Sequence, residues 1–221
     1  MLTKPLKVLG IDDHPIVLEG YNFMFRNLES QHERLDFVKA VDCRSAQLAV
    51  QQHSNEHFDL AIIDYSIPAL PEEKLFSGKD IALLIRENMP GCKIIMMTMH
   101  RELDIVFSII NTVKPQGFIN KSDCDTDELM QAFANVLKGE TFYSSLITKY
   151  SNMIQKGMVL EEVDVKIMRF LARGVEDRNI TSYIPLTYKE IESRKNNIKN
   201  VLGVEGNDQE LIEEARAQGY I

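Results

Sequence analysis

The sequence predicts an α/β protein with a doubly wound, five-stranded parallel sheet over its first two-thirds, followed by a small all-α domain. From Leu6 to about residue 138, short apolar runs alternate with segments of helical period, a pattern typical of βαβ units. From Leu160 onward the strand pattern is absent, and apolar residues repeat only at helical spacing.

Composition narrows the class of protein. The 221 residues are 44% hydrophobic, which is enough for at least one full core. No apolar stretch approaches the roughly 20 residues that span a membrane, and no signal-peptide core is evident, so we expect a cytoplasmic protein. Three cysteines without CxxC spacing argue against a disulfide framework or a zinc site. The net charge of -8 disfavours non-specific coating of nucleic acid but does not exclude a local basic face.

Four strand-like runs end in residues suited to phosphate chemistry, and a fifth strand is expected near residues 37–41. The four runs and the residues that follow them are 7–11 with Asp12 and Asp13, 58–63 with Asp64, 93–97 with Thr98, and 117–120 with Lys121. Ligands bind at the carboxyl ends of parallel strands, so we expect these side chains to share one pocket.

Helices are expected between the strands. The first begins near Pro15 and carries an apolar stripe of Val17, Tyr21, Met24 and Leu28. A second begins near Ser45. The last helix of this domain ends near Gly139, a residue type that commonly terminates helices.

The residue types in this pocket indicate phosphoryl chemistry. Clustered Asp12, Asp13 and Asp64 would repel one another, and such groups either raise a pKa or recruit a cation. An all-oxygen ligand set suits Mg²⁺. Asp64 is the candidate nucleophile toward phosphorus, with Lys121 as the charge and Thr98 as the hydroxyl that contact the phosphoryl oxygens. Any one of these residues alone is more often an ordinary turn residue, but their joint occurrence favours the site.

The same stretches carry a family resemblance. Residues 8–15, 59–64, 97–98 and 117–121 resemble the receiver domain of bacterial two-component response regulators. The resemblance implies a flavodoxin-like fold, and Mg²⁺-dependent transfer of a phosphoryl group from a sensor histidine kinase to Asp64. It also implies a metal site of Asp12, Asp13, Asp64 and the backbone carbonyl of Ser66. Phe118 takes the position of the switch aromatic that moves with Thr98, although a plain core role is the simpler interpretation.

Two features depart from that family. The loop 65–77, before Gly78, is several residues longer than usual, and Met99 is bulky where a small residue is common. Both border the expected pocket.

The C-terminal part carries a second resemblance. Residues 165–174 and 191–204 resemble the LuxR-type helix-turn-helix of NarL/FixJ regulators, and Thr187 with Glu190 forms a capping box before the later helix. We therefore expect a receiver domain at 1–139, a linker without a long period at 140–157, and a helix-turn-helix domain at 158–221.

In that family the helix near residues 188–201 enters the major groove. The candidate DNA contacts are Lys189, Arg194, Lys195, Asn197 and Lys199, with Asn197 equally readable as a solvated surface residue. Residues 160–221 nevertheless hold nine Lys and Arg against twelve Asp and Glu, and Glu190 and Glu192 lie on the same helix.

Two functions stay open. The first is a homodimeric transcription regulator that binds double-stranded DNA when Asp64 is phosphorylated. The second is a phospho-responsive protein-interaction regulator whose degenerate helix-turn-helix no longer binds DNA. We expect no enzyme, because no second catalytic cluster is present beyond the self-modified Asp64.

Overall fold

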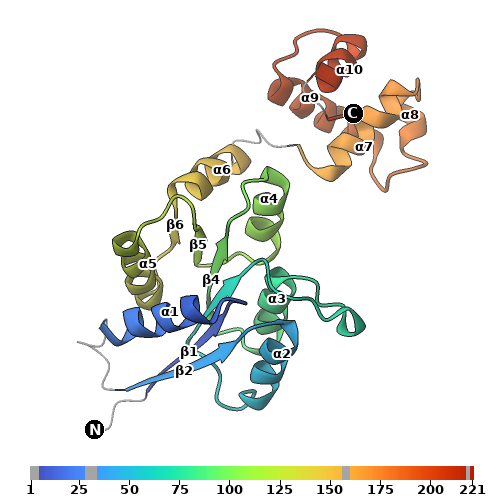
Figure 1. Ribbon diagram of the computed structural model, residues 1–221. Coiled ribbons are helices and arrows are strands. Elements are labelled where there is room, and N and C mark those ends of the chain that lie inside the picture. Colours follow the sequence, from blue (N-terminus) through green and yellow to red (C-terminus); the bar gives the residue numbers. More distant parts are fainter. Residues whose placement is uncertain (1–4, 28–33, 156–159, 218–219) are drawn as a thin grey trace. The chain divides into compact units, whose positions relative to one another are not determined.

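The computed structural model describes residues 5–27, 34–155, 160–217 and 220–221. The chain packs as two compact units, Met1–Tyr150 and Ser151–Ile221. Figure 1 shows that the first unit is a sheet flanked by helices and the second is a group of helices. Among the described residues, no helix has both the length and the apolar character needed to cross a bilayer.

The first unit contains a fully parallel sheet in the order β2-β1-β3-β4-β5-β6. Its strands are β1 Leu6–Ile11, β2 Leu35–Ala40, β3 Leu60–Asp64, β4 Lys93–Thr98, β5 Gly117–Asn120 and β6 Phe142–Tyr143. The central strands are buried on both faces, which explains their nearly continuous apolar sequence.

The register of the sheet positions the expected site. Ile11 of β1 pairs with Ile63 of β3, so the next residues, Asp12 and Asp64, come side by side at the carboxyl edge. Thr98 pairs with Asn120, which places Lys121 directly after the end of β5. Strand pairing therefore brings these strand ends together at one edge of the sheet.

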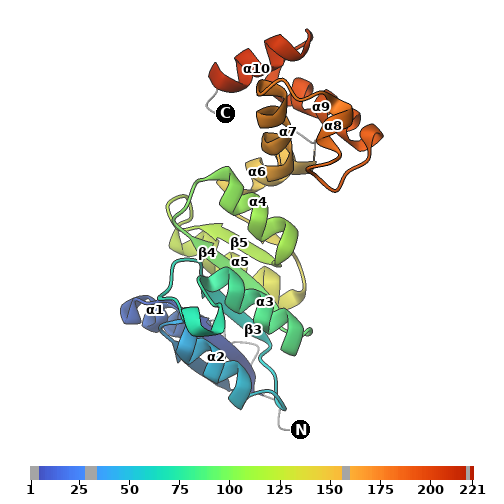
Figure 2. The same cartoon turned by 90° about the vertical axis from the view of Figure 1, so that its right-hand side faces the viewer.

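Helices cover both faces of this sheet (Figure 2). They are α1 Pro15–Asn27, α2 Cys43–Gln52, α3 Gly78–Asn88, α4 Leu103–Thr112, α5 Thr126–Lys138 and α6 Ser145–Gln155. Side chains of α1 and α5 form one core layer, whereas those of α2, α3 and α4 form the other. The expected start at Pro15 and stop at Gly139 are correct, and Gly139 adopts the left-handed conformation with φ of 91°. Leu28 of the expected α1 stripe lies outside the described residues.

The segment expected to be a linker is structured. It contains the sixth strand, β6, and most of it forms the helix α6. The prediction of five strands was therefore one short, and the prediction of an irregular linker over 140–157 was wrong for residues 142–155. Ile147 of α6 is fully buried in the same core layer as α2, α3 and α4, and Tyr150 and Ile154 repeat at helical spacing after it, so tertiary packing stabilises this helix along one apolar face. The boundary expected at 157 and 158 lies outside the described residues.

The second unit is all-helical, as expected. It contains α7 Glu162–Ala172, α8 Asp177–Ile180, α9 Tyr188–Leu202 and α10 Asp208–Ala217. Thr187 caps α9 through its hydroxyl, and Glu190 completes the expected capping box. Ile191, Ile198 and Leu202 of α9 are buried in the core of this unit, while Val201 is half-buried.

The loop between β3 and α3 is ordered against the first unit. Residues 65–77 contain a 3₁₀ turn at Pro71–Glu73 and a bridge between Leu70 and Leu75, both of which are buried. Where the loop ends, Gly78 donates its N–H to the carbonyl of Tyr65. A Cβ atom at Gly78 would lie 1.9 Å from the backbone oxygen of Asp64, so only glycine allows α3 to begin this close to the end of β3.

Gly78→Ala should displace the backbone at Asp64 and lower the free energy of unfolding by about 1–3 kcal/mol, the usual cost of overpacking. Chemical denaturation of the purified protein measures this. Gly91→Ala is the matched control, because a Cβ there meets nothing within 4 Å. Equal stability of the two variants would contradict the steric argument.

Candidate functional site

The carboxyl ends of β1, β3 and β5 bring two aspartates and a lysine together. The Nζ atom of Lys121 lies 2.7 Å from Oδ2 of Asp12 and 3.1 Å from Oδ2 of Asp64. Asp12 is fully buried and Asp64 is only 6% exposed. Because burying a charge is costly unless it is paired, the Lys121 ammonium is what allows both carboxylates to lie in one pocket.

The electrostatics of the pocket reflect this balance. Burial raises the pKa of Asp64, Lys121 opposes that rise, and the charges of Asp12 and Asp13 add to it. Burial also acts to lower the pKa of Lys121, but its contacts with Asp12 and Asp64 outweigh burial and raise that pKa above its usual value. The pocket therefore concentrates negative charge that a single ammonium compensates only in part.

A third carboxylate and an imidazole lie at the rim of this pocket. The Nδ1 atom of His14 is 3.1 Å from Oδ1 of Asp12 and 2.8 Å from Oδ1 of Asp13. Potential ligand atoms of these three residues all lie within 4.8 Å of one another. Asp13 and His14 are exposed, so this group is open to solvent on one side.

The donor set fits a hard divalent cation. Carboxylate oxygens of Asp12 and Asp13 are grouped tightly, and the charge of Asp64 is felt by the same group. Of the four metal ligands expected from the sequence, Asp12 and Asp13 are grouped together, and Asp64 shares the Lys121 ammonium with Asp12. Ser66 follows closely after β3, and its side-chain hydroxyl contacts Nε2 of His100 at 3.2 Å. The role of its carbonyl as a ligand stays a prediction.

Thr98 lies fully buried at the end of β4, next to the lysine. Its carbonyl accepts the Lys121 backbone N–H at 2.7 Å, and its hydroxyl oxygen accepts the backbone N–H of His100 at 2.9 Å. A hydroxyl oxygen can accept while it donates its single proton elsewhere. In this structure Thr98 therefore holds the loop after β4 through its hydroxyl oxygen, and that bond does not use the hydroxyl proton.

Phe118 is fully buried two strands away from Asp64. Its ring packs edge-to-face against Tyr143 of β6, with ring centroids 6.4 Å apart. It is part of the core, as the simpler interpretation expects, and a switching role stays a prediction. Met99 has a 62% exposed side chain and lines a shallow hollow with His100, Arg101 and Glu102.

Three of the five expected DNA-contacting residues are engaged within the second unit. Arg194 places Nη1 2.9 Å from Oδ1 of Asp164, which is buried in α7, and Nη2 2.9 Å from Oε2 of Glu161. Lys195 places Nζ 2.7 Å from Asp177 and 2.6 Å from Asp208.

Lys199 completes this internal set. It donates to the carbonyl of Gly206 at 2.8 Å. These three side chains tie α9 to the start of α7, α8 and α10. The expectation that they present free charge to phosphates does not fit their positions, because each is paired inside the unit.

The solvent-exposed face of α9 holds a different set of residues. It carries five side chains at helical spacing, which are Lys189, Glu192, Ser193, Asn196 and Asn200. Among the expected contacts, Lys189 belongs to this face and Asn197 is half-buried beside it. We call these five residues the α9 outer face.

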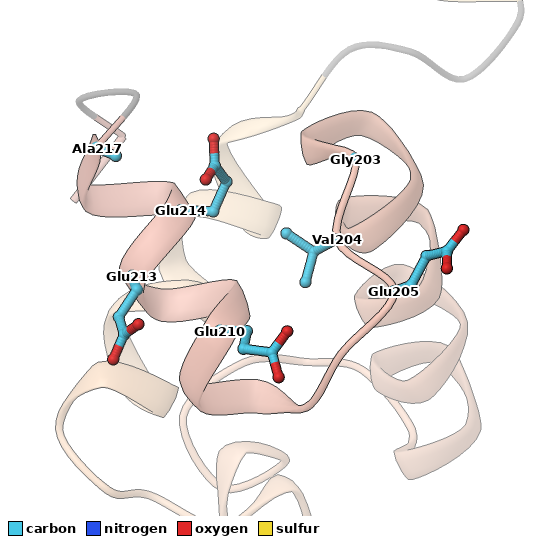
Figure 3. A pocket seen from close by; sticks show the side chains of 7 residues that line it. All are labelled: Gly203, Val204, Glu205, Glu210, Glu213, Glu214 and Ala217. Atoms are coloured by element: carbon cyan, nitrogen blue, oxygen red, sulfur yellow. The ribbon is translucent and has the colours of Figure 1, made fainter.

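A hollow of about 450 Å³ lies between the end of α9 and α10 (Figure 3). Four glutamates line it, namely Glu205, Glu210, Glu213 and Glu214. Its charge is opposite to that of a phosphate-binding surface, so this side of the unit does not suit a nucleic-acid backbone.

Sequence reasoning missed two groups in the first site. His14 was noticed only as part of the run after β1, and Asn120 only as the residue before Lys121. Asn120 is fully buried and donates to the carbonyl of His100 at 2.7 Å. Their positions next to Asp13 and Lys121 were the only signals.

Lys195→Met should lower the free energy of unfolding of the second unit by about 2 kcal/mol, because it removes two charge-assisted hydrogen bonds but keeps the aliphatic stem. Thermal and chemical denaturation of the full chain measure this. Lys189→Met, on the exposed outer face, is the matched control and should change stability by less than about 0.5 kcal/mol. If both variants unfold alike, the structural role of Lys195 is wrong.

Comparison with known proteins agrees with this geometry. Residues 8–134 match the model of the response regulator receiver domain family, which covers more than half of the chain. The Oxygen regulatory protein NreC of Staphylococcus haemolyticus is 26% identical over 95% of this chain and 96% of its own length. The Transcriptional regulatory protein MctR of Rhizobium johnstonii is 25% identical over 92% and 91%.

Solved structures share the fold. The response regulator RcsB in complex with DNA matches 97% of this chain and 99% of its own, with a TM-score of 0.58 and 24% identity. RcsB from Salmonella enterica serovar Typhimurium bound to promoter P1flhDC matches 96% and 98%, with a TM-score of 0.56 and 24% identity. The fold, the convergence of aspartates and lysine at the sheet edge, and the family match lead to one conclusion: the chain belongs to the response regulators, with an N-terminal receiver domain.

Proposed function

We propose that this response regulator is phosphorylated on Asp64 by a sensor histidine kinase in the cytoplasm and then regulates transcription through its C-terminal unit. One observation carries the first half of the proposal: the Lys121 ammonium bridges Asp12 and Asp64, within 2.7 and 3.1 Å of their carboxylates.

The chemistry assigns a task to each side chain. An oxygen of Asp64 attacks the phosphorus of a phosphohistidine, the P–N bond breaks, and the departing imidazole nitrogen keeps the electron pair. Lys121 stabilises the negative charge on the transferred oxygens, and the Thr98 hydroxyl donates to one of them. Asp12 and Asp13 would hold Mg²⁺ beside Asp64, and the ion would neutralise charge on the transferred group.

The acyl phosphate forms on a nearly buried carboxylate. Asp64 is 6% exposed, and burial raises its pKa. Transfer requires the ionised form, so Lys121 and a divalent cation both favour the reactive state by opposing that effect.

Asp64→Asn should abolish labelling of the full chain by radiolabelled acetyl phosphate in magnesium buffer, because an amide is not a nucleophile toward phosphorus. Scintillation counting of acid-labile label measures this. Asp127→Asn, at an exposed site in the first turn of α5, is the control and should label normally. Chelation of magnesium should suppress labelling of the unsubstituted protein. Label that persists on Asp64→Asn would reject the phosphoacceptor.

The second half of the proposal concerns double-stranded DNA. The relatives named above are regulatory proteins by name, and RcsB is described in complex with DNA. In this chain the α9 outer face offers one lysine, one glutamate, one serine and two asparagines. Asparagine side chains can pair with adenine through two hydrogen bonds, so this face suits base contacts better than phosphate contacts. Binding as a homodimer would present two such faces to a two-fold symmetric site.

Asn196→Ala should weaken binding to duplexes enriched from a random pool by about 5- to 100-fold, the value of a lost pair of base contacts. Fluorescence anisotropy across a range of salt concentrations measures this. Glu213→Ala, in the acidic hollow, is the control, and it should not weaken binding. A pool from which no duplex is enriched at any salt concentration would exclude the DNA function.

A second function is favoured by a specific observation. Arg194, Lys195 and Lys199 are paired internally, and four glutamates line the hollow beside α10. A unit with this charge distribution also suits a phospho-responsive regulator that contacts another protein. The absence of duplex enrichment, together with phosphorylation-dependent self-association of the chain, would support this alternative.

A further inference from the structure

We propose that α6 reports the state of Asp64: the loops at the ends of β4 and β5 hold its N-terminal half, and phosphorylation weakens that hold at Tyr150. The inference rests on the proposed phosphorylation of Asp64. Tyr150 is the last residue of the first compact unit, and α6 continues from it into the second. A change at this residue therefore occurs where the chain passes between units.

The loop after β4 connects Thr98 to α6. The Thr98 hydroxyl accepts the backbone N–H of His100 at 2.9 Å. The next residue, Arg101, offers its carbonyl to the phenol of Tyr150 at 3.0 Å. Two hydrogen bonds, made by the neighbouring residues His100 and Arg101, thus connect Thr98 in the pocket to Tyr150 in α6.

The loop after β5 makes a second connection. Asn120, directly before Lys121, donates its backbone N–H to the Ser144 hydroxyl at 3.0 Å, and its side chain donates to the His100 carbonyl at 2.7 Å. Both loops are therefore fixed to each other and to the residue before α6.

Asp123 holds the first turn of α6. Its Oδ2 atom accepts the Leu146 N–H at 2.6 Å, which satisfies one of the free donors at the start of a helix. Its buried Oδ1 atom has no hydrogen-bond partner among the residues that the structure describes. Because one of its two carboxylate oxygens lacks a partner there, the half-buried Asp123 side chain depends on its bond to Leu146 of α6. The backbone N–H of Asp123 donates to the Asn120 carbonyl, which ties this residue to the Lys121 loop.

Phe118 makes the third connection. Its ring packs edge-to-face against Tyr143 of β6, so rotation of the Phe118 ring would change the packing around Tyr143. Tyr143 in turn accepts at its carbonyl the Thr148 hydroxyl of α6, at 3.0 Å. A movement of Phe118, the expected switch residue, would therefore be passed through Tyr143 to α6.

The direction of the effect follows from the hydrogen bonds. When the Thr98 hydroxyl turns toward a phosphoryl group on Asp64, its oxygen moves away from the His100 N–H. The backbone at residues 100 and 101 then loses its anchor, and Tyr150 loses a fixed acceptor. A local charge change thereby loosens a packed helix.

Hydrogen–deuterium exchange of the full chain tests the inference. Beryllofluoride with magnesium, a mimic of the phosphoryl group, should speed exchange of peptides within 145–155 by about 3- to 10-fold, the effect of losing one hydrogen bond. Tyr150→Phe should speed exchange by a similar factor without beryllofluoride and reduce the further increase on adding it. Asp123→Ala removes the acceptor of the Leu146 N–H and should act in the same direction.

A control variant and a labelling experiment separate failure of this inference from failure of the proposed function. Tyr183→Phe, an exposed tyrosine of the second unit, should leave exchange over 145–155 unchanged. Label on Asp64 from acetyl phosphate, combined with unchanged exchange of α6 on adding beryllofluoride, would overturn the inference and leave the proposed function intact. Absence of label on the unsubstituted protein would overturn both.

Discussion

The receiver unit depends on one constraint, namely that Lys121 must lie between two buried carboxylates. Its ammonium contacts Asp12 and Asp64, which strand pairing places next to each other at the sheet edge. Without that positive charge, two nearly buried carboxylates would lie side by side uncompensated, which is costly. The same partial neutralisation leaves the site attractive to a divalent cation and to a phosphoryl group. The same ion pairs of Lys121 thus stabilise the fold and prepare the site for phosphoryl transfer.

The sequence predicted this site well because its determinants are local. Each strand is a short apolar run, and each functional residue comes at or directly after the end of one. Parallel pairing of the strands then brings these residues to the same edge of the sheet. Asp12, Asp64, Thr98 and Lys121 could be placed without knowledge of any side-chain contact. Phe118 was placed with equal ease, but its edge-to-face partner could not be found, since Tyr143 belongs to a strand of two residues that shows no period.

The C-terminal unit shows where such reasoning ends. The sequence correctly predicted the capping box of Thr187 and Glu190, because that motif is read over four residues. It could not show that Arg194 and Lys195 are paired with Asp164, Asp177 and Asp208, since those partners lie 13 to 30 residues away and meet them only through packing. A basic residue on a helix is free only if its tertiary neighbours leave it so. The helix α6 is a different case: Ile147, Tyr150 and Ile154 repeat at helical spacing, so its sequence carries a helical period that the linker prediction overlooked.

The pairing of β6 with β5 has a practical consequence for dividing this chain into fragments. A receiver fragment that stops at Gly139 would omit Phe142 and Tyr143, which register with Gly117 and Phe118. Without β6, the backbone N–H and C=O groups along one side of β5 would be unpaired and could pair with another chain. The Phe118 ring would also lose its contact with Tyr143. Such a fragment is prone to aggregate, whereas one that extends through Gln155 keeps the edge closed.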